Sequence, residues 1–229
     1  MKLIKINDHD LAQSFWILVL IILSGGLQDS YSYFFRGGVF ANAQTGNVIL
    51  MSVNLFEGNF SIAVTYLLPI IAFVLGIIVA KTVKHFLEDK KFYWKQCILL
   101  IEAALLLGVC FIPEKLNWLA NALVSFSCAM QVITFDKIYG NNFATTMCVG
   151  NLVKMSDSFI KSIINKDKEL LKRSGIYLLV IIIFAIGAGC GYLLEKVLGT
   201  YTICVSSGLI LIASFGFMLN DAKQPKERG

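Results

Sequence analysis

Six long apolar runs constrain this chain more than any other feature, because each run of roughly 17 to 22 residues can cross a bilayer as a helix. They cover about residues 12–33, 62–80, 96–112, 116–135, 174–194 and 201–219. Hydrophobic residues make up 57% of the 229 residues and charged residues only 15%, which is typical of polytopic membrane proteins. The loops leave no room for a soluble domain, so we expect residues 1–229 to form a single all-α membrane domain.

Two other segments, about residues 39–56 and 143–161, are rich in Asn, Thr, Ser and Gly. If neither crosses, all 20 Lys and Arg residues except Arg36, Lys115 and Lys196 share the side of the N-terminus. By the positive-inside rule, the side of the membrane that carries the excess of Lys and Arg is the cytoplasmic side. We therefore expect six full transmembrane helices, two cytoplasmic termini and two re-entrant or broken polar helices, the first entering from outside and the second from inside. A full crossing of both polar segments is the alternative.

The two polar segments resemble each other. The heptapeptide GNVILMS begins at Gly46, and GNLVKMS, identical at four of seven positions, begins at Gly150. The spans around them follow in the same order, which divides the chain into repeat 1, about 12–112, and repeat 2, about 116–219. Each repeat holds three full crossings, an odd number, so the second repeat must be inverted. In such designs two broken helices meet near the bilayer midplane around a solute site. The other explanation for the likeness of the two segments is that a gene duplication retained glycines needed only for packing.

The motifs of the first repeat also carry a family resemblance. The run GGLQDSYSYFFRGGVFANAQTGN contains a Gly-x-x-Asp at Gly26–Asp29, a Gly-x-Phe at Gly38–Phe40 and a Thr-Gly-Asn at Thr45–Asn47. It resembles the signature of the YoaK-like family of bacterial inner-membrane proteins, and the likeness extends over nearly the whole chain in length and span order. The resemblance implies a polytopic membrane protein and supplies no established substrate. Val149 replaces the Thr of Thr-Gly-Asn in the second repeat, so the two halves are not strictly equivalent.

Acidic residues at membrane depth are candidates for proton coupling, because an ionised carboxylate there is costly unless it is paired or hydrated. Asp29 lies near the end of the first span, and Arg36, seven residues later, is a candidate charge partner. Both side chains can equally be hydrated at the interface. Glu102, within the run 96–112, is the second proton-coupling candidate or a residue paired inside the bundle.

Glycines, amides and hydroxyls near the two polar segments are candidates for solute binding, because glycine admits close backbone approach and these side chains both donate and accept. Together with Asp29 they are Gln28, Asn42, Gln44, Thr45, Gly46, Asn47, Gln131, Thr145, Thr146, Gly150 and Asn151. Capping of restarted helices is an alternative role for the Asn and Thr residues. The second segment also carries a polar stripe, Asn151, Lys154, Asp157 and Lys161, which either lines a site or lies among lipid head groups.

Other function classes lack support in the sequence. There is no GxSxG, HExxH or P-loop motif, so we do not expect an enzyme or an ATP-driven pump. The six cysteines are scattered without CxxC spacing, so we expect reduced packing residues, no metal and no cofactor. The formal charge of +5 is spread over short loops, which indicates membrane topology and no nucleic-acid partner. Gly187, Gly189 and Gly191 form a small-residue face that includes a GxxxG, for helix packing within the chain or for a homodimer.

Together these observations predict a small secondary transporter in a bacterial inner membrane. It would move a small polar or weakly charged solute, with protons as a candidate coupling ion through Asp29 or Glu102. A passive channel of paired half-helices is the alternative, although neither segment contains the Asn-Pro-Ala of water channels. A non-transporting membrane partner protein is the third reading.

Overall fold

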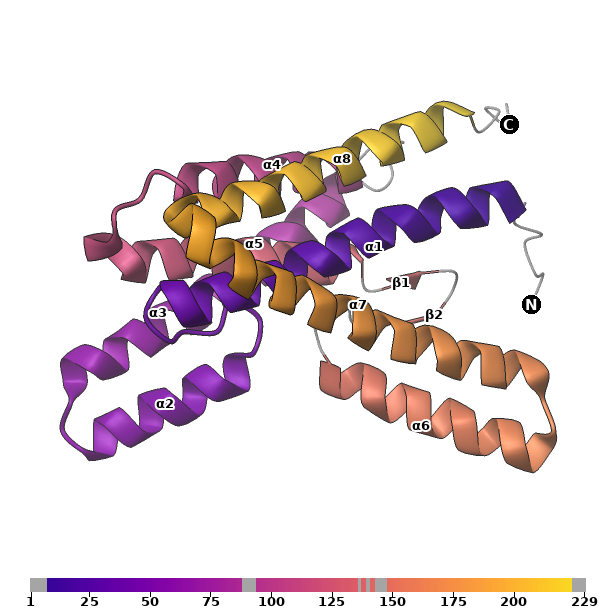
Figure 1. The fold of residues 1–229 in the computed structure, drawn as a ribbon, viewed down its shortest axis with the longest axis horizontal. Helices are drawn as coiled ribbons and strands as arrows, with labels where there is room; N and C mark the ends of the chain where they lie inside the picture. Colours follow the sequence, from indigo (N-terminus) through magenta and orange to yellow (C-terminus); the bar gives the residue numbers. More distant parts are fainter. Residues whose placement is uncertain (1–7, 88–93, 136, 139–140, 143–147, 224–229) are drawn as a thin grey trace.

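The computed structural model describes residues 8–87, 94–135, 137–138, 141–142 and 148–223, and most of them are helical (Figure 1). The α-helices are α1 (Asp8–Ser30), α2 (Gln44–Phe56), α3 (Phe60–Leu87), α4 (Trp94–Val109), α5 (Asn117–Thr134), α6 (Cys148–Asn165), α7 (Lys168–Leu198) and α8 (Thr202–Lys223). Short elements join them: the π-helical turn η1 (Tyr31–Phe35), the 3-10 turns η3 (Glu114–Leu116) and η4 (Gly199–Tyr201), and the strands β1 (Lys137–Ile138) and β2 (Asn141–Asn142), which pair antiparallel.

Local sequence explains where the long apolar helices end. Gly58 turns the chain between α2 and α3 with a φ of +78°, and Gly199 ends α7 with a φ of +53°, conformations that glycine adopts readily. Asp167 starts α7 as an N-cap, since its Oδ1 accepts hydrogen bonds from Glu169 N at 2.8 Å and Leu170 N at 3.4 Å. Gly58 and Asp167 thus separate α2 from α3, and α6 from α7, into two antiparallel hairpins, while Gly199 separates α7 from α8.

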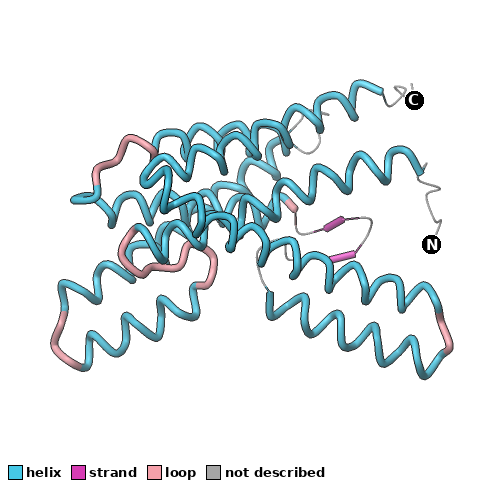
Figure 2. The backbone as a smooth tube through the Cα atoms, in the orientation of Figure 1, coloured by secondary structure: helices cyan, strands magenta, loops and turns pink. Residues whose placement is uncertain are grey.

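The helices pack in a pattern that repeats within the chain. Helix α1 lies against α7, and α5 lies against α3. Helix α4 contacts α5, and α8 contacts α1, while α4 and α8 contact each other. The α2–α3 and α6–α7 hairpins project toward opposite ends of the molecule, so their connecting turns lie far apart (Figure 2).

Three glycines permit the closest of these helix contacts. A Cβ at Gly26 in α1 would overlap the Phe184 carbonyl of α7, and one at Gly187 in α7 would overlap the Leu23 carbonyl of α1. A Cβ at Gly76 would likewise overlap a carbonyl of α5. Within the expected glycine face of α7, Gly187 and Gly191 therefore pack against α1 of the same chain, whereas a Cβ at Gly189 would meet nothing within 4 Å.

The protein is a helical membrane protein. Four stretches of the described residues are long and apolar enough to span a bilayer: Phe15–Phe35, Phe60–Leu87, Glu114–Thr134 and Lys168–Leu219, the last containing both α7 and α8. The expected run 96–112 corresponds to α4, whose 16 residues are fewer than the roughly 20 of a typical span. Many large apolar side chains on α3 and α7 are exposed, as lipid-facing surfaces require.

One expectation about the cysteines is wrong. Cys110, which follows α4, and Cys204, in the first turn of α8, form a disulfide with a Cα–Cα distance of 6.3 Å. The other four cysteines are free. The bonded pair is separated by 94 residues with no characteristic spacing, so only the packing of α4 against α8 brings the two thiols together.

Candidate functional site

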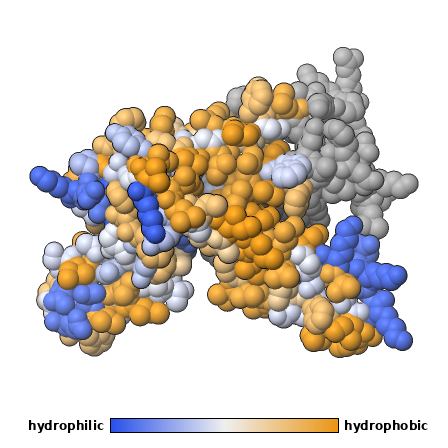
Figure 3. Space-filling model, viewed as in Figure 1, coloured by the Kyte–Doolittle hydropathy of each residue, from blue (hydrophilic) through white to orange (hydrophobic). Residues whose placement is uncertain are grey.

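A cavity of about 750 Å³ lies between the α2–α3 and α6–α7 hairpins. The first residues of both α2 and α6 line it, so two helix N-termini meet at one cavity. From there α2 runs toward one end of the molecule and α6 toward the other (Figure 1). The space-filling view shows a hollow between the two lobes that these hairpins form (Figure 3). The volume lies within the range of small-molecule pockets, roughly 300–1,000 Å³.

Aromatic side chains make up much of the cavity wall. They are Tyr33, Phe34, Phe40, Phe73 and Phe184. The Tyr33 and Phe40 rings stack with their centroids 4.4 Å apart. Such a lining favours a solute that carries an apolar part as well as polar groups.

Asp29 is the one charged side chain among the described residues that line the cavity. It is half-buried near the end of α1, and its Oδ1 accepts a 2.7 Å hydrogen bond from Asn42 N, two residues before α2. The carboxylate therefore lies near the positive end of the α2 dipole, which stabilises a negative charge. Asn42 is buried and its own Oδ1 has no hydrogen-bond partner, so an acceptor remains available in the cavity wall.

The loop that enters the cavity is shaped by the Thr-Gly-Asn motif. Asn47 is fully buried, accepts from Phe40 N at 3.0 Å and donates to Phe40 O at 2.7 Å. A Cβ at Gly46 would lie 2.8 Å from the Phe40 ring, so glycine lets this ring cover the first turn of α2. Gln44 adds a further hydrogen bond within this loop, from its Nε2 to Ala41 O at 2.8 Å. Gly46 and Asn47 thus hold the loop in shape, whereas Gln44 and Thr45 line the cavity directly.

Arg36 is not the charge partner of Asp29. Its guanidinium donates to Tyr31 Oη at 2.7 Å, Asn117 Oδ1 at 3.0 Å and Val109 O at 3.2 Å, and the side chain is almost completely buried. Among the described residues no ion pair joins it to Asp29. Arg36 therefore fastens the loop after η1 to the ends of α4 and α5, which sequence separation alone could not reveal.

Gln28 and Glu102 lie in the bundle interior, away from the cavity lining. Gln28 Nε2 donates to Ser24 Oγ at 2.9 Å, Ser206 Oγ at 3.1 Å and Glu102 Oε1 at 3.3 Å. Gln28 Oε1 accepts from Cys128 Sγ at 2.8 Å. The second carboxyl oxygen of Glu102 is buried without a partner. This polar cluster therefore connects α1, α4, α5 and α8. Its central residue, Gln28, directly precedes Asp29 in the chain.

The solute-binding candidates of the second repeat also fall into two groups, one at the cavity and one in the bundle interior. Gly150 lines the cavity at the start of α6. Asn151 is buried beside it, and Gln131 is buried in α5, where its Nε2 donates to Ile21 O at 2.8 Å. Thr145 and Thr146 fall outside the described residues.

Sequence reasoning missed part of this site. It did not single out Phe73 and Phe184, the two rings that α3 and α7 supply to the cavity. A signal existed, because each ring begins a Phe-x-x-Gly motif that ends at a close-packing glycine, Gly76 or Gly187. Ser24, Ser206 and Cys128 of the buried cluster were also missed, since small polar residues in apolar helices carry no distinctive spacing.

The described side chains of the site are suited to non-covalent binding. Among the described parts of the chain, no group of three or more His, Cys, Asp or Glu side chains gathers in one place. The cavity instead combines one carboxylate, amide and hydroxyl groups, aromatic rings and two helix N-termini. This set can bind a solute by hydrogen bonds and apolar contacts without covalent chemistry.

Comparisons with known proteins identify a family and a transmembrane relative. The profile of the family described as "Protein of unknown function (DUF1275)" matches residues 17–216. The UPF0700 transmembrane protein YoaK of Bacillus subtilis (strain 168) is 24% identical over 182 residues, which cover 75% of this chain and 80% of that protein. No solved structure matches the chain. Because the profile covers most of the sequence, the chain belongs to the DUF1275 family, the YoaK-like transmembrane proteins.

Proposed function

We propose that this protein is a small secondary transporter in which solute binds in the cavity between α2 and α6. One observation carries the proposal: both helices begin at the wall of the same cavity and run toward opposite ends of the molecule. Broken helices with facing N-termini are how many secondary transporters form their central solute site. The absence of an ATP-binding motif from the sequence is consistent with transport driven by a gradient.

Two inverted repeats, α1–α4 and α5–α8, are part of the proposal. The contact of α1 with α7 corresponds to that of α5 with α3, and the two α2-type hairpins correspond to each other. The glycine contacts correspond in the same way. Gly76 of α3 approaches the Phe126 carbonyl of α5, and Gly187 of α7 approaches the Leu23 carbonyl of α1. Ser207 Oγ donates to Ala103 O at 2.7 Å where the last helices of the repeats meet. These correspondences support a two-fold relation whose axis passes between α4 and α8.

In this arrangement α1, α3, α4, α5, α7 and α8 cross the membrane, and α2 and α6 reach only to its middle. Helix α2 has 13 residues, so at about 1.5 Å per residue it covers roughly 20 Å, too little for a full crossing. Helix α6 has 18 residues but carries Lys154, Asp157 and Lys161, whose charges make a full crossing costly, whereas α4 has only Glu102 within its apolar stretch. Both termini lie in the cytoplasm, because the Lys-rich segments then share the cytoplasmic side. The membrane in this proposal is the bacterial inner membrane.

The transported solute is small and polar or weakly charged, with an apolar part that contacts the aromatic rings. Asp29 and the free acceptor of Asn42 provide its polar contacts. Asp29 and Glu102 are the proton-coupling groups, because each carboxyl group lies at membrane depth without a basic partner among the described residues. Gln28, adjacent to Asp29 in the chain and bonded to Glu102, connects the two regions.

Flux measurements in proteoliposomes test the proposal. Uptake of candidate solutes should be saturable, should depend on a pH gradient and should be lost in Asp29→Asn. Glu57→Gln, which removes an exposed acid in the α2–α3 turn, is the matched control and should retain uptake. Non-saturable flux that ignores the gradient would instead indicate a channel. No flux of any solute class would refute both transport readings.

Site-directed labelling tests the inverted arrangement separately. Single cysteines at Gly58 and Lys166, in a chain whose four free cysteines, Cys97, Cys128, Cys148 and Cys190, are replaced by Ser, should react with impermeant reagents from opposite sides of the membrane. These positions lie in the α2–α3 and α6–α7 turns, at opposite ends of the molecule (Figure 2). Labelling of both positions from one side would refute the inverted repeat.

A further inference from the structure

A second, smaller cavity lies between α6 and α7, away from the central site. It has a volume of about 280 Å³ and is lined by Lys154, Asp157, Ser158, Lys161, Leu170, Arg173 and Tyr177. Three of these side chains are basic and one is acidic, so the pocket has a positive balance. The polar stripe noted in the second polar segment supplies this wall, since Lys154, Asp157 and Lys161 belong to both.

Arg173 has hydrogen-bonding capacity that the protein does not use. Its Nε is buried and has no hydrogen-bond partner. A guanidinium offers several donors in one plane, which fits the oxygens of a phosphate group. Lys161, on the facing helix, has a side chain that is 57% exposed and is free to reach an anion while it pairs with Asp157 at 2.8 Å. The pocket therefore presents an unsatisfied donor and an exposed cation to the same space.

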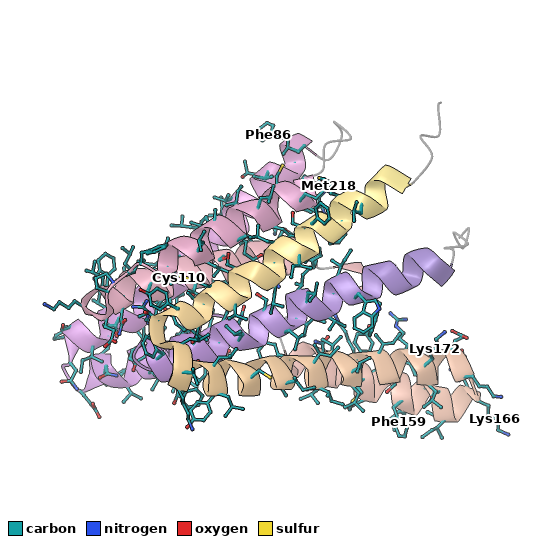
Figure 4. The ribbon with its side chains drawn as sticks, turned by 45° about the horizontal axis from the view of Figure 1, so that its top comes forward. Phe86, Cys110, Phe159, Lys166, Lys172 and Met218 are labelled. Atoms are coloured by element: carbon teal, nitrogen blue, oxygen red, sulfur yellow. A yellow bond between two sulfur atoms is a disulfide. The ribbon has the colours of Figure 1, made fainter. Side chains whose placement is uncertain are left out.

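The depth of the pocket in the bilayer indicates which anion reaches it. Helix α7 carries no charged residue from Ser174 to Leu194, a length close to the roughly 30 Å of a hydrocarbon core. Arg173 directly precedes this stretch and so lies at the boundary between hydrocarbon and head groups. Beyond it, Lys166 and Lys172 lie at the far end of the α6–α7 hairpin, away from Cys110 (Figure 4).

The surface beside the pocket is apolar. Phe159, Ile160, Ile163 and Ile164 of α6 are all exposed. In the space-filling view the strongly hydrophilic tip of this hairpin adjoins a hydrophobic surface (Figure 3). Acyl chains can cover these side chains while a head group enters the pocket, whereas a free anion would leave them uncovered. Basic pockets between membrane helices bind anionic lipid head groups by this combination.

We propose that the α6–α7 pocket binds a phosphate group, and that an anionic phospholipid presents it. Arg173 and Lys161 contact the phosphate oxygens, and the apolar face of α6 contacts the acyl chains. The site does not depend on transport through the central cavity. It also does not depend on which side of the membrane the hairpin faces.

Lipid retention by the purified full-length protein tests this site. Native mass spectrometry in detergent should show phosphatidylglycerol bound in preference to phosphatidylcholine. Lys161→Gln should weaken phosphatidylglycerol binding about fivefold, the usual effect of one basic residue at an anionic surface. Because Lys161 is exposed, this variant should fold normally. Lys172→Gln removes the same charge from an exposed position outside the pocket and should bind nearly as the original protein does.

Two further arms make the result decisive. Asp157→Asn removes the acid of the pocket and should strengthen phosphatidylglycerol binding. Glycerol phosphate and inorganic phosphate are offered alone, and neither should bind in the concentration range at which the lipid does. If a soluble phosphate binds as tightly as the lipid, the lipid assignment is overturned. If Lys161→Gln and Lys172→Gln weaken lipid binding equally, the pocket itself is overturned as the site.

Discussion

The Gly46→Ala substitution measures how tightly the aromatic ring of Phe40 covers the first turn of α2. A methyl group at Gly46 would lie 2.8 and 2.9 Å from two carbons of this ring, whereas carbon atoms prefer a separation of about 3.5–4.0 Å. The ring cannot simply rotate away, because it stacks on Tyr33 and its backbone is bonded in both directions to Asn47.

Two opposing terms set the expected magnitude. Overpacking of this kind costs about 1–3 kcal/mol, while replacing glycine by alanine inside a helix contributes up to about 1 kcal/mol of stability. We therefore expect Gly46→Ala to lower the free energy of unfolding by about 1–2 kcal/mol. In a Phe40→Ala background the overlap is absent, so Gly46→Ala should be neutral or stabilising, which gives a coupling energy of about 1–3 kcal/mol between the two positions.

Thermal or denaturant unfolding of the four variants in detergent provides the measurement. Gly108→Ala in α4 is the matched control, because nothing lies within 4 Å of the added methyl group, and it should not destabilise the protein. If Gly46→Ala costs the same with and without the Phe40 ring, the two residues do not touch, and the loop geometry that positions the central cavity is incorrect.

Three further substitutions test other parts of the structure. Gly187→Leu should lower the unfolding temperature strongly because α1 lies directly against this glycine, whereas Gly189→Leu, with nothing within 4 Å, should be tolerated; equal effects would contradict the α1–α7 contact. Arg36→Lys should reduce the free energy of unfolding by about 2–4 kcal/mol, because an ammonium cannot replace three guanidinium bonds to buried groups, and a smaller loss than 1 kcal/mol in chemical unfolding would argue against this network. A maleimide-linked polymer should label Cys110 and Cys204 only after reduction, and labelling of both in the unreduced protein would exclude the disulfide.

The contrast between Asp29 and Arg36 shows how far sequence reasoning extended into the site. Both were singled out as charges at membrane depth, and both are indeed held by specific contacts. Their spacing suggested a pair on one helix, but the chain leaves the α-helical path at η1, between them. Asp29 consequently lies at the cavity and Arg36 at the ends of α4 and α5. A local break in helical geometry, which no residue type marked, decided their separate roles.

The Thr-Gly-Asn motif shows a similar division. Its polarity marked it as special, and two roles were open, solute binding and capping. In the structure Asn47 is occupied by Phe40 and Gln44, while Thr45 lines the cavity. Neighbouring residues of one motif therefore serve different purposes, since successive residues on a helix point in different directions.

The helical membrane character of this chain follows from its amino-acid sequence, because stretches of some 20 apolar residues have few alternatives in water or lipid. The sequence also located the polar segments and their likeness to each other, since these depend on local residue identity. Helix packing, which the residue pattern does not reveal, places the starts of α2 and α6 at one cavity, lines that cavity with Phe73 and Phe184, and brings Cys110 to Cys204. These outcomes depend on which helices pack together, and in this chain the choice rests on a few glycines whose contacts join residues at least 50 positions apart, such as Gly76 with Phe126 and Gly187 with Leu23. Apolar periodicity indicates that a helix has a partner, and close packing selects the partner.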